Sequence, residues 1–434
     1  MADYGTVRTS AQQADLGTIA GYLYRLMLRN LASDGFVFTD PADPNRFSAP
    51  GCVIASPSYE RDLASIRQNY VFNWTRDAAV VALEIAAAHD PVIDGGSGPL
   101  DDYVTFAATC QRGTPTLGRA CYTIEGEPRA WTDQYDGPAI QSIALAAAFD
   151  QLGPDAQVLA RAVIERNLAF VVDNWSAPSH NLWEETRGQS FFARSVQLRC
   201  LTELRANTLG AAVPAAVDAA IAGLTEALDG HWNGVHYVSV LEPESPRAGY
   251  DPNIDIVMAA VYGAVPVTDP RLLATAAQLR AQWTDPVSPV AYPINATDGA
   301  LGLGPMLGRY PGDVYDGDDN TSGTSHPWAL CTANFAELQY RLASAIEADG
   351  TVPIADVSRP FFAALGIDDT MPPRDAAARL RLSGDRMLRA VIHHGDHLEL
   401  SEQFDGTTGY EKSVRNLSWS YAAFLSAARA RVSN

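Results

Sequence analysis

Apolar residues recur every three or four positions along most of this chain, and that spacing restricts its fold more than any other feature. The stretches "LGTIAGYLYRLMLRN" and "PWALCTANFAELQYRLASAIEA" show it most clearly, because it gathers apolar side chains on one face of a helix. Segments with the pattern cover residues 12–30, 76–90, 101–112, 138–152, 155–175, 190–208, 213–229, 252–264, 269–285, 327–347, 357–366, 374–394 and 418–432. Strand patterns are short, at 34–40 and 231–241. Without strand–helix alternation, the sequence predicts an all-α fold with minor β-hairpin content rather than a parallel-sheet enzyme.

Long connections separate several of the predicted helices. They cover residues 40–75, 113–137, 176–189, 286–326 and 395–417, and they are rich in Gly, Pro, Asp and aromatic residues. Long loops in a compact domain are commonly functional, and their Trp, Tyr and Arg content indicates ordered binding loops. No low-complexity linker, repeat or change of composition divides the chain, so we expect one domain over residues 1–434.

The net charge and the hydropathy of the chain limit the classes of partner that it can bind. A net charge of −20 opposes binding to nucleic acid and to anionic membranes. No apolar run approaches the 18 or so residues that a membrane helix requires. The N-terminus "MADYGTVRTSAQQAD" lacks the basic start and apolar stretch of a signal peptide, which predicts a cytoplasmic protein or the mature form of a secreted one. The oligomeric state stays open.

Cysteine usage excludes two common scaffolds. The five cysteines are odd in number and form no C-x-x-C pair: Cys52, Cys110, Cys121, Cys200 and Cys331. A disulfide framework and a zinc ribbon are therefore not expected. We interpret these residues as small buried apolar side chains.

Each long loop contains or borders a short stretch that combines aromatic and acidic residues. The stretches are "YVFNWTRDAA" (70–79), "RAWTDQYDGPA" (129–139), "NLWEETRG" (181–188), "LGRYPGDVY" (307–315) and "LSEQFDGTTG" (400–409). Aromatic faces pack on the C–H faces of sugar rings, while carboxylates and guanidinium groups bind hydroxyls. Gathered into one pocket, these loops predict a carbohydrate site.

The two adjacent glutamates, Glu184 and Glu185, raise a question of geometry. Neither a helix nor a strand points neighbouring side chains the same way, so the two cannot face one bond together. If one of them acts on a bond, the carboxylate across from it must come from elsewhere in the chain.

The set of stretches resembles the glucoamylase family, glycoside hydrolase family 15, whose members are inverting exo-α-glucosidases. The resemblance lies in Trp74–Asp77, Asp136–Ala139, Leu182–Glu185, Arg309–Tyr315 and Ser401–Asp405, and in the final "RNLSWSYAAFLSAARAR", all in the family's order. Any one of these tags is weak, because a glutamate beside a tryptophan is usually just solvated or salt-bridged. The ordered set over residues 70–431 implies an (α/α)6 barrel of six inner and six outer helices.

By this resemblance, Glu184 is the general acid and Glu402 the general base that activates water. Inversion needs a carboxylic acid at the glycosidic oxygen and a carboxylate about 6.5–9.5 Å away across the sugar. We expect packing against Trp183 and other aromatic residues to keep Glu184 protonated, and the polar loop "SEQFDG" to keep Glu402 ionised. Glu185 then points elsewhere, toward the hydroxyls of the leaving sugar.

The resemblance also implies a sugar-binding set. Tyr70 corresponds to a tyrosine that helps hold the water, and the arginines and Asp77 bind hydroxyls of the terminal sugar. The predicted substrate-binding residues are Tyr70, Trp74, Arg76, Asp77, Trp131, Leu182, Trp183, Glu185, Arg309, Trp328 and Trp419.

Acid–base hydrolysis needs only two carboxyl groups and water, so no cofactor and no metal are predicted. The "HHGDH" at 393–397 lacks the register of a helical zinc motif, and "DVYDGDDN" at 313–320 lacks the spacing of a calcium loop. The histidines are more simply explained as helix-end or core residues.

Some positions depart from the family pattern. "WTDQYDG" lacks an arginine usual in its loop, Gly312 replaces an acid, and Asn416 stands where an aspartate is common. The sequence also gives no sign of a starch-binding module or an N-terminal β-sandwich. We therefore expect hydrolysis of short soluble α-glucans or malto-oligosaccharides, releasing β-glucose from non-reducing ends. An α-1,6 specialist acting on isomaltose or dextran fragments, a trehalase, and a catalytically silent sugar-binding protein remain alternatives.

Overall fold

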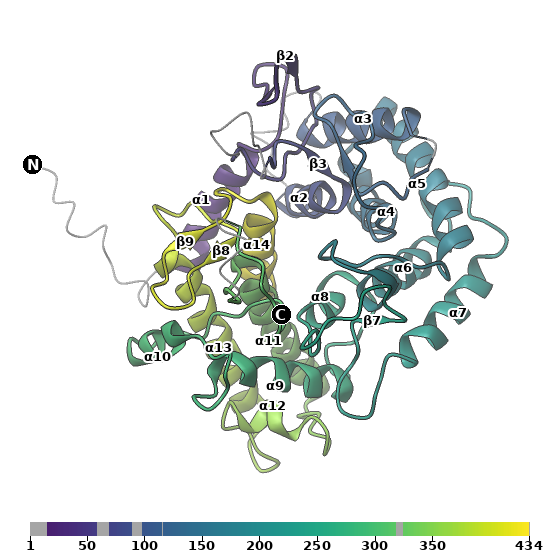
Figure 1. Cartoon of the computed structure of the whole chain (residues 1–434). Helices are drawn as coiled ribbons and strands as arrows, with labels where there is room; N and C mark the ends of the chain where they lie inside the picture. Colours follow the sequence, from purple (N-terminus) through teal and green to yellow (C-terminus); the bar gives the residue numbers. More distant parts are fainter. Residues whose placement is uncertain (1–14, 59–68, 89–97, 115, 318–323, 434) are drawn as a thin grey trace, which may run out of the picture.

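The computed structural model describes residues 15–58, 69–88, 98–114, 116–317 and 324–433. Within them, the long helices alternate between two concentric rings (Figure 1). The inner ring is α2 (Thr75–Ala88), α4 (Gly137–Ala148), α6 (Phe191–Leu204), α8 (Asp255–Tyr262), α11 (Ala329–Asp349) and α14 (Ser418–Val432). The outer ring is α1 (Leu16–Leu28), α3 (Pro99–Arg112), α5 (Pro154–Asn174), α7 (Val217–Asp229), α9 (Pro270–Thr284) and α13 (Pro373–His394). The fold is an (α/α)6 barrel, as predicted.

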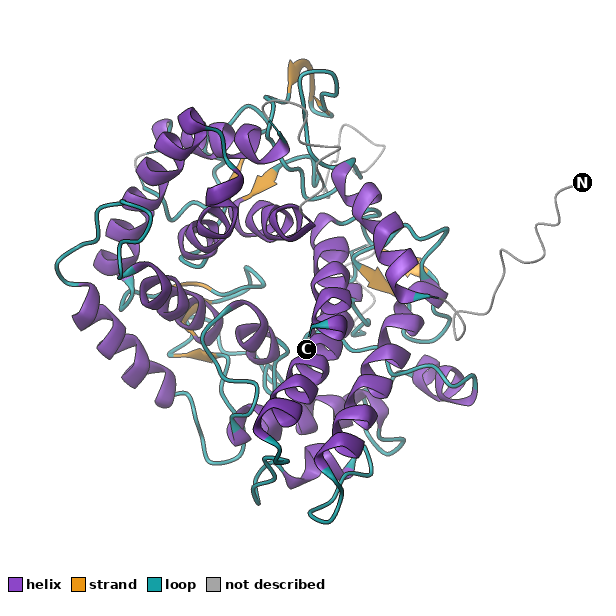
Figure 2. Ribbon diagram, turned by 180° about the vertical axis from the view of Figure 1, so that it is seen from behind, coloured by secondary structure: helices purple, strands orange, loops and turns teal. Residues whose placement is uncertain are grey.

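Contacts between helices close the inner ring. Each inner helix packs against the next one along the chain, and α14 returns to α2. The outer helices cover them, with α5 on α4, α7 on α6 and α13 on α11. Figure 2, the view from behind, shows the inner helices side by side around a common axis.

The amino-acid composition of each helix explains whether it lies in the inner or the outer ring. Inner helices are apolar on most faces because they contact neighbours on several sides; all eight residues of α8 are buried. Outer helices are amphipathic. In α7 only Val217, Ala220 and Leu224 are buried, a single stripe at helical spacing that faces the inner ring.

Short β-ladders brace the loops. Strands β1 (Thr39–Asp40) and β2 (Asp43–Phe47) pair, as do β3 (Asn73–Trp74) with β4 (Cys121–Tyr122) and β8 (Gln403–Phe404) with β9 (Glu411–Lys412). A three-stranded sheet joins β5 (Ser179–His180), β6 (Arg187–Ser190) and β7 (Val240–Leu241). All pairs are antiparallel. Of the two predicted strands, 34–40 and 231–241, only the last two residues of each form a strand, in β1 and β7.

All thirteen predicted helical segments contain a helix, although several are shorter than predicted. The segment at 357–366 contains only α12 (Arg359–Ala363), and the segment at 138–152 ends in a 3-10 turn, Phe149–Gln151. Helix α10 (Pro293–Ala300) is an addition inside a predicted loop. Its sequence "PINATDGA" buries only Ile294 and Asp298, so no apolar stripe marks it. The predicted segment 12–30 begins outside the described residues.

Two further observations bear on the sequence predictions. All five cysteines are buried and free, which agrees with their interpretation as small apolar side chains. No helix in the described parts of the chain is both long enough and apolar enough to cross a membrane.

Candidate active site

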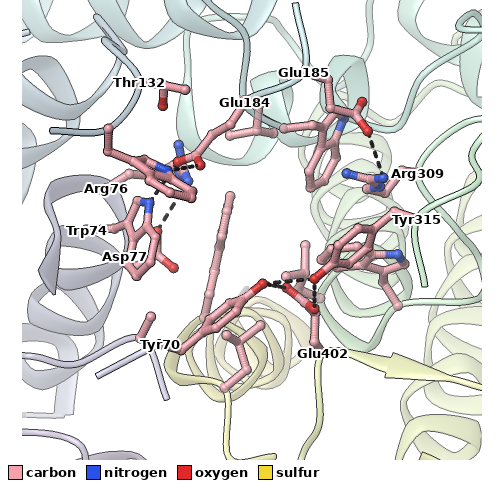
Figure 3. Close-up of a pocket in the computed structure, with 18 residues that line it drawn as sticks. Tyr70, Trp74, Arg76, Asp77, Thr132, Glu184, Glu185, Arg309, Tyr315 and Glu402 are labelled. Carbon is pink, nitrogen blue, oxygen red and sulfur yellow. Dashed lines mark hydrogen bonds and ion pairs between the residues drawn. The ribbon is translucent and has the colours of Figure 1, made fainter. Parts of the chain in front are cut away.

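The loops that precede the inner helices enclose a cavity of about 300 Å³. A volume of this size is at the lower end of the range for small-molecule sites. All thirteen predicted site residues line it: Tyr70, Trp74, Arg76, Asp77, Trp131, Leu182, Trp183, Glu184, Glu185, Arg309, Trp328, Glu402 and Trp419. Residues from five distant loops therefore meet in one pocket (Figure 3).

A tight turn separates the two adjacent glutamates. The backbone N–H of Glu184 donates to the carbonyl of Asn181 at 3.0 Å, and the Asn181 side chain accepts from the backbone N–H of Glu185 at 3.0 Å. Glu184 adopts a φ of +62°, a left-handed conformation that is uncommon outside glycine. Such strain is often kept where it orients a functional side chain. The turn sends the two carboxyl groups to different parts of the pocket.

Two indole groups hold the Glu184 carboxyl. Trp74 Nε1 donates to its Oε1 at 2.7 Å, and Trp131 Nε1 donates to its Oε2. The sequence predicts Trp183 and other aromatic residues around Glu184; Trp74 and Trp131 are such residues, whereas the Trp183 indole donates to Asn253 at 3.0 Å. Trp131 is 45% exposed and stands at the rim of the pocket. Glu184 is half-buried beneath it.

The Glu402 carboxyl lies across the cavity from Glu184 (Figure 3). Tyr70 donates to its Oε1 at 3.2 Å, and Tyr315 donates to its Oε2 at 3.2 Å. The Ser413 hydroxyl makes a third, short hydrogen bond to Oε2. Each of these donors stabilises the ionised form of the carboxyl.

Burial opposes that stabilisation. The sequence predicts a polar loop around Glu402, but the residue is only 5% exposed. Burial raises the pKa of Glu402 to about 7, although Ser413, Arg309 and the two tyrosines lower it. The predicted polar loop, residues 401–406, supplies none of the three hydroxyl donors, which come from Tyr70, Tyr315 and Ser413. The charge of Glu402 instead depends on a few buried donors.

Glu185 turns away from the Glu184 carboxyl toward a cationic cluster. Arg309 Nη2 lies 3.0 Å from its Oε1, and Arg247 Nη1 lies 3.2 Å from the same atom. The Tyr310 hydroxyl donates to its Oε2 at 2.7 Å. Glu185 is thus an ion-pair partner that still borders the pocket.

Arg309 is the buried centre of an aromatic cage. Its guanidinium lies 4.9–5.3 Å from the ring centroids of Trp183, Tyr310, Tyr315 and Trp328. Asp313 accepts from Arg309 Nε at 2.8 Å and from Arg309 Nη2 at 2.6 Å. This two-point contact fixes the orientation of the Arg309 guanidinium group. Cation–π contacts stabilise a charge that has lost most of its water.

A second buried guanidinium, Arg76, lies on the opposite wall. Its Nη1 donates to Asp136 at 3.1 Å and to Gln134 at 3.0 Å, and its face lies 4.8 Å from the Trp419 ring. Asp77 lies beside it, with 3.4 Å between Asp77 Oδ2 and Arg76 Nη2. That Asp77 oxygen is buried without a hydrogen-bond partner among the described residues. Burial raises the pKa of Asp77 to about 6.

Five lining residues lie beyond the predicted set: Ala55, Thr132, Tyr315, Leu330 and Leu417. Tyr315 is the most consequential, because it contacts Glu402. It ends the stretch Arg309–Tyr315, so the motif itself pointed to it. Ser413 carried no comparable signal, since serine is common in loops and only its position beside Glu402 gives it a role.

The histidine pair that ends α13 has a structural partner. His394 Nε2 lies 3.1 Å from both carboxylate oxygens of Asp298. Across the described residues, no group of three or more His, Cys, Asp or Glu side chains is arranged to hold a metal ion. The stretch 313–320, considered above as a calcium loop, lies partly outside the described residues.

Comparison with known proteins gives a consistent result. The model of glycosyl hydrolases family 15 matches residues 25–429. A glucoamylase of Blastobotrys adeninivorans is 30% identical over 438 residues, which cover 88% of this chain and 68% of the relative. Glucoamylase 1 of Rhizopus oryzae is 29% identical, over 93% of this chain and 68% of its own length. Among solved structures, the glucoamylase of Hormoconis resinae superposes with a TM-score of 0.79 at 25% identity, over 96% of this chain and 73% of that one.

Proposed function

The chain belongs to glycosyl hydrolase family 15 and is a glucoamylase-like hydrolase of α-glucans, and from this premise we propose an inverting, exo-acting reaction with Glu184 as general acid and Glu402 as general base. The observation that carries this proposal is the placement of these two carboxyl groups on opposite sides of one pocket (Figure 3). An inverting reaction needs that arrangement, because acid and nucleophilic water act on opposite faces of the sugar.

In the proposed step, Glu184 gives its proton to the glycosidic oxygen as the bond from C1 to that oxygen breaks. Glu402 takes a proton from water, and the water oxygen bonds to C1 from the other face. An α-linked glucose thereby leaves as β-glucose, with Glu184 ionised and Glu402 protonated. The indole N–H groups of Trp74 and Trp131 then stabilise the Glu184 carboxylate that remains.

The rest of the pocket suits a terminal glucose. Asp77 has a buried oxygen to which no described residue donates a hydrogen bond, and a sugar hydroxyl can donate to it. Arg76 and Arg309 supply positive charge on the two walls. The faces of Trp419 and Trp328 offer apolar surface for the C–H groups of the ring.

The linkage is set by the acceptor side of the pocket. Trp131 is exposed at the rim, and Thr132 lies next to it. We take α-1,4-linked malto-oligosaccharides as the substrate. Isomaltose or dextran fragments and trehalose are the alternatives that the same catalytic pair would serve.

Proton NMR of the purified protein with maltose, maltotriose, isomaltose and trehalose tests the proposal. We expect the H1 doublet of β-glucose to appear first, before mutarotation, and to appear fastest with the malto-oligosaccharides. Early α-glucose would remove Glu402 from the role of water-activating base. Consumption of only isomaltose or trehalose would assign the other linkage.

The Glu402→Gln variant distinguishes an enzyme from a sugar-binding protein without catalytic activity. Glutamine keeps the size of the side chain but cannot accept the proton from water, so turnover should be lost while maltose still binds. Wild-type turnover in this variant would contradict the base role. No turnover in either protein, with tight sugar binding in both, would identify a sugar-binding protein.

A further inference from the structure

Lys412 is the only lysine in the 434 residues of the chain. It lies on β9, where it pairs with Gln403 on β8, the strand that directly follows Glu402. Its Nζ lies 3.0 Å from Oδ2 of Asp316, and its side chain is only 19% exposed. A partly buried ammonium group on the strand that pairs with β8 requires a physical explanation.

Asp316 joins two segments of the chain through this contact. Its side chain is 2% exposed, and the same Oδ2 lies 3.1 Å from Nε2 of His326. A buried carboxylate is costly unless it is paired and hydrogen-bonded. The ammonium of Lys412 and the imidazole of His326 both contact this carboxylate and satisfy that requirement.

The chain neighbours of this pair both contact Glu402. Tyr315 directly precedes Asp316, and Ser413 directly follows Lys412; both hydroxyls donate to Glu402 Oε2. The ion pair therefore connects, one residue away, the two segments that supply these donors. The Gln403 side chain adds a second tie, since its Nε2 donates to the Tyr315 carbonyl at 3.0 Å and its Oε1 accepts from the Gly317 N–H at 3.0 Å.

We infer that Lys412 is a positioning residue for the catalytic base: its ion pair with Asp316 holds the Tyr315 and Ser413 hydroxyls against Glu402. The inference rests on the proposed role of Glu402. Without the ammonium, the buried Asp316 carboxylate loses this ion pair, and the segment 315–317 shifts to rehydrate it. Tyr315 moves with that segment, while the sugar-binding walls formed by Arg76 and Arg309 stay in place.

The test is a kinetic comparison on maltotriose of the wild type, Lys412→Met and Lys412→Arg. We expect Lys412→Met to lower kcat about tenfold, since misplacing a catalytic group by an ångström can cost up to a hundredfold. KM should stay within twofold. Lys412→Arg keeps the charge and should recover most of kcat. Arg359→Met, in α12, is the matched control, because it breaks an exposed ion pair between Arg359 and Asp369 and should leave both constants unchanged.

A double-mutant comparison distinguishes positioning from general stabilisation. In the background Tyr315→Phe/Ser413→Ala, which lacks both hydroxyl donors, adding Lys412→Met should lower kcat less than twofold, because little remains to position. An undiminished tenfold loss in that background, or no rescue by arginine, would overturn the inference. If Lys412→Met does not fold, the variant Lys412→Met/Asp316→Asn, which removes the Asp316 charge together with the ammonium, takes its place.

Measuring the Glu402→Gln variant in parallel distinguishes a failure of the positioning role of Lys412 from a failure of the base role of Glu402. An inactive Glu402→Gln together with wild-type kinetics in Lys412→Met would refute the positioning role alone. An active Glu402→Gln would refute the proposed base, and the positioning role with it.

Discussion

Replacing Tyr315 with phenylalanine should change the pH at which the enzyme loses activity. The substitution removes one hydroxyl donor, 3.2 Å from Oε2 of Glu402, and keeps the aromatic ring. Hydrogen bonds to charged groups contribute about 1.5–3 kcal/mol. Because 3.2 Å is long for an O–H···O bond, we take the lower end, which corresponds to about one pKa unit. The pKa of Glu402, which burial already raises to about 7, should rise further.

The sign of the effect follows from the role of the base. A general base works only when ionised, so kcat/KM falls as the pH drops through the pKa of Glu402. In Tyr315→Phe this acidic limb should move about one pH unit upward. The variant should lose about tenfold in kcat/KM well below the limb and much less well above it.

Profiles of kcat/KM against pH for maltotriose measure this directly, since they report on the free enzyme. Tyr310→Phe is the matched control: it removes a hydroxyl that donates to Glu185 and should leave the limb in place. A Tyr315→Phe profile that drops equally at every pH, or whose limb does not move, would refute the role given to this hydroxyl.

Two other predictions concern the acid and the stability of the barrel. Glu184→Gln should cost about 10²- to 10⁴-fold on maltose, and at least tenfold less on α-glucosyl fluoride, whose leaving group needs little protonation; equal losses on both substrates would contradict the acid role. Burial raises the pKa of Glu84 from 4.5 to about 7 despite its partner Arg429, so folding takes up a proton and stability falls as pH rises from about 4.5 to 7. Glu84→Gln should remove up to about 3 kcal/mol of that fall, and thermal unfolding of both proteins at pH 5 and pH 8 would show an unchanged slope if the reasoning fails.

The sequence predicts which residues line the pocket better than it predicts the electrostatic surroundings of those residues. Trp74, Glu184 and Arg309 belong to short sequence stretches that lie directly before inner helices or in loops at the mouth of the barrel. Because these stretches can be recognised in the sequence, the residues that line the pocket can be predicted from them. The surroundings of Glu402 could not be predicted in this way. Its burial depends on Tyr70 and Tyr315, which lie 332 and 87 residues away in the chain.

Local signals also explain the differences in the fold. Helix α11 carries a long apolar pattern and lies where it was predicted. Helix α10 begins at Pro293 and contains Asn, Asp and Gly, which favour turns, so its packing rather than its propensity decides its conformation. The ion pair of Lys412 with Asp316 joins residues 96 positions apart, and no spacing rule connects them.

Counting lone pairs on the two carboxyl groups refines the proposed reaction. Each carboxylate oxygen has two acceptor sites. At Glu402, Tyr315 and Ser413 occupy both sites on Oε2, whereas Tyr70 is the one donor to Oε1 among the described residues. We propose that the nucleophilic water takes the remaining site on Oε1, held by the carboxylate and by the neighbouring Tyr70 hydroxyl. At Glu184 each oxygen receives one indole N–H, and neither indole can accept a proton. In the proposed reaction, the proton that Glu184 gives up therefore sits at a site other than the two that accept the indole N–H groups, and its transfer to the glycosidic oxygen breaks neither indole hydrogen bond.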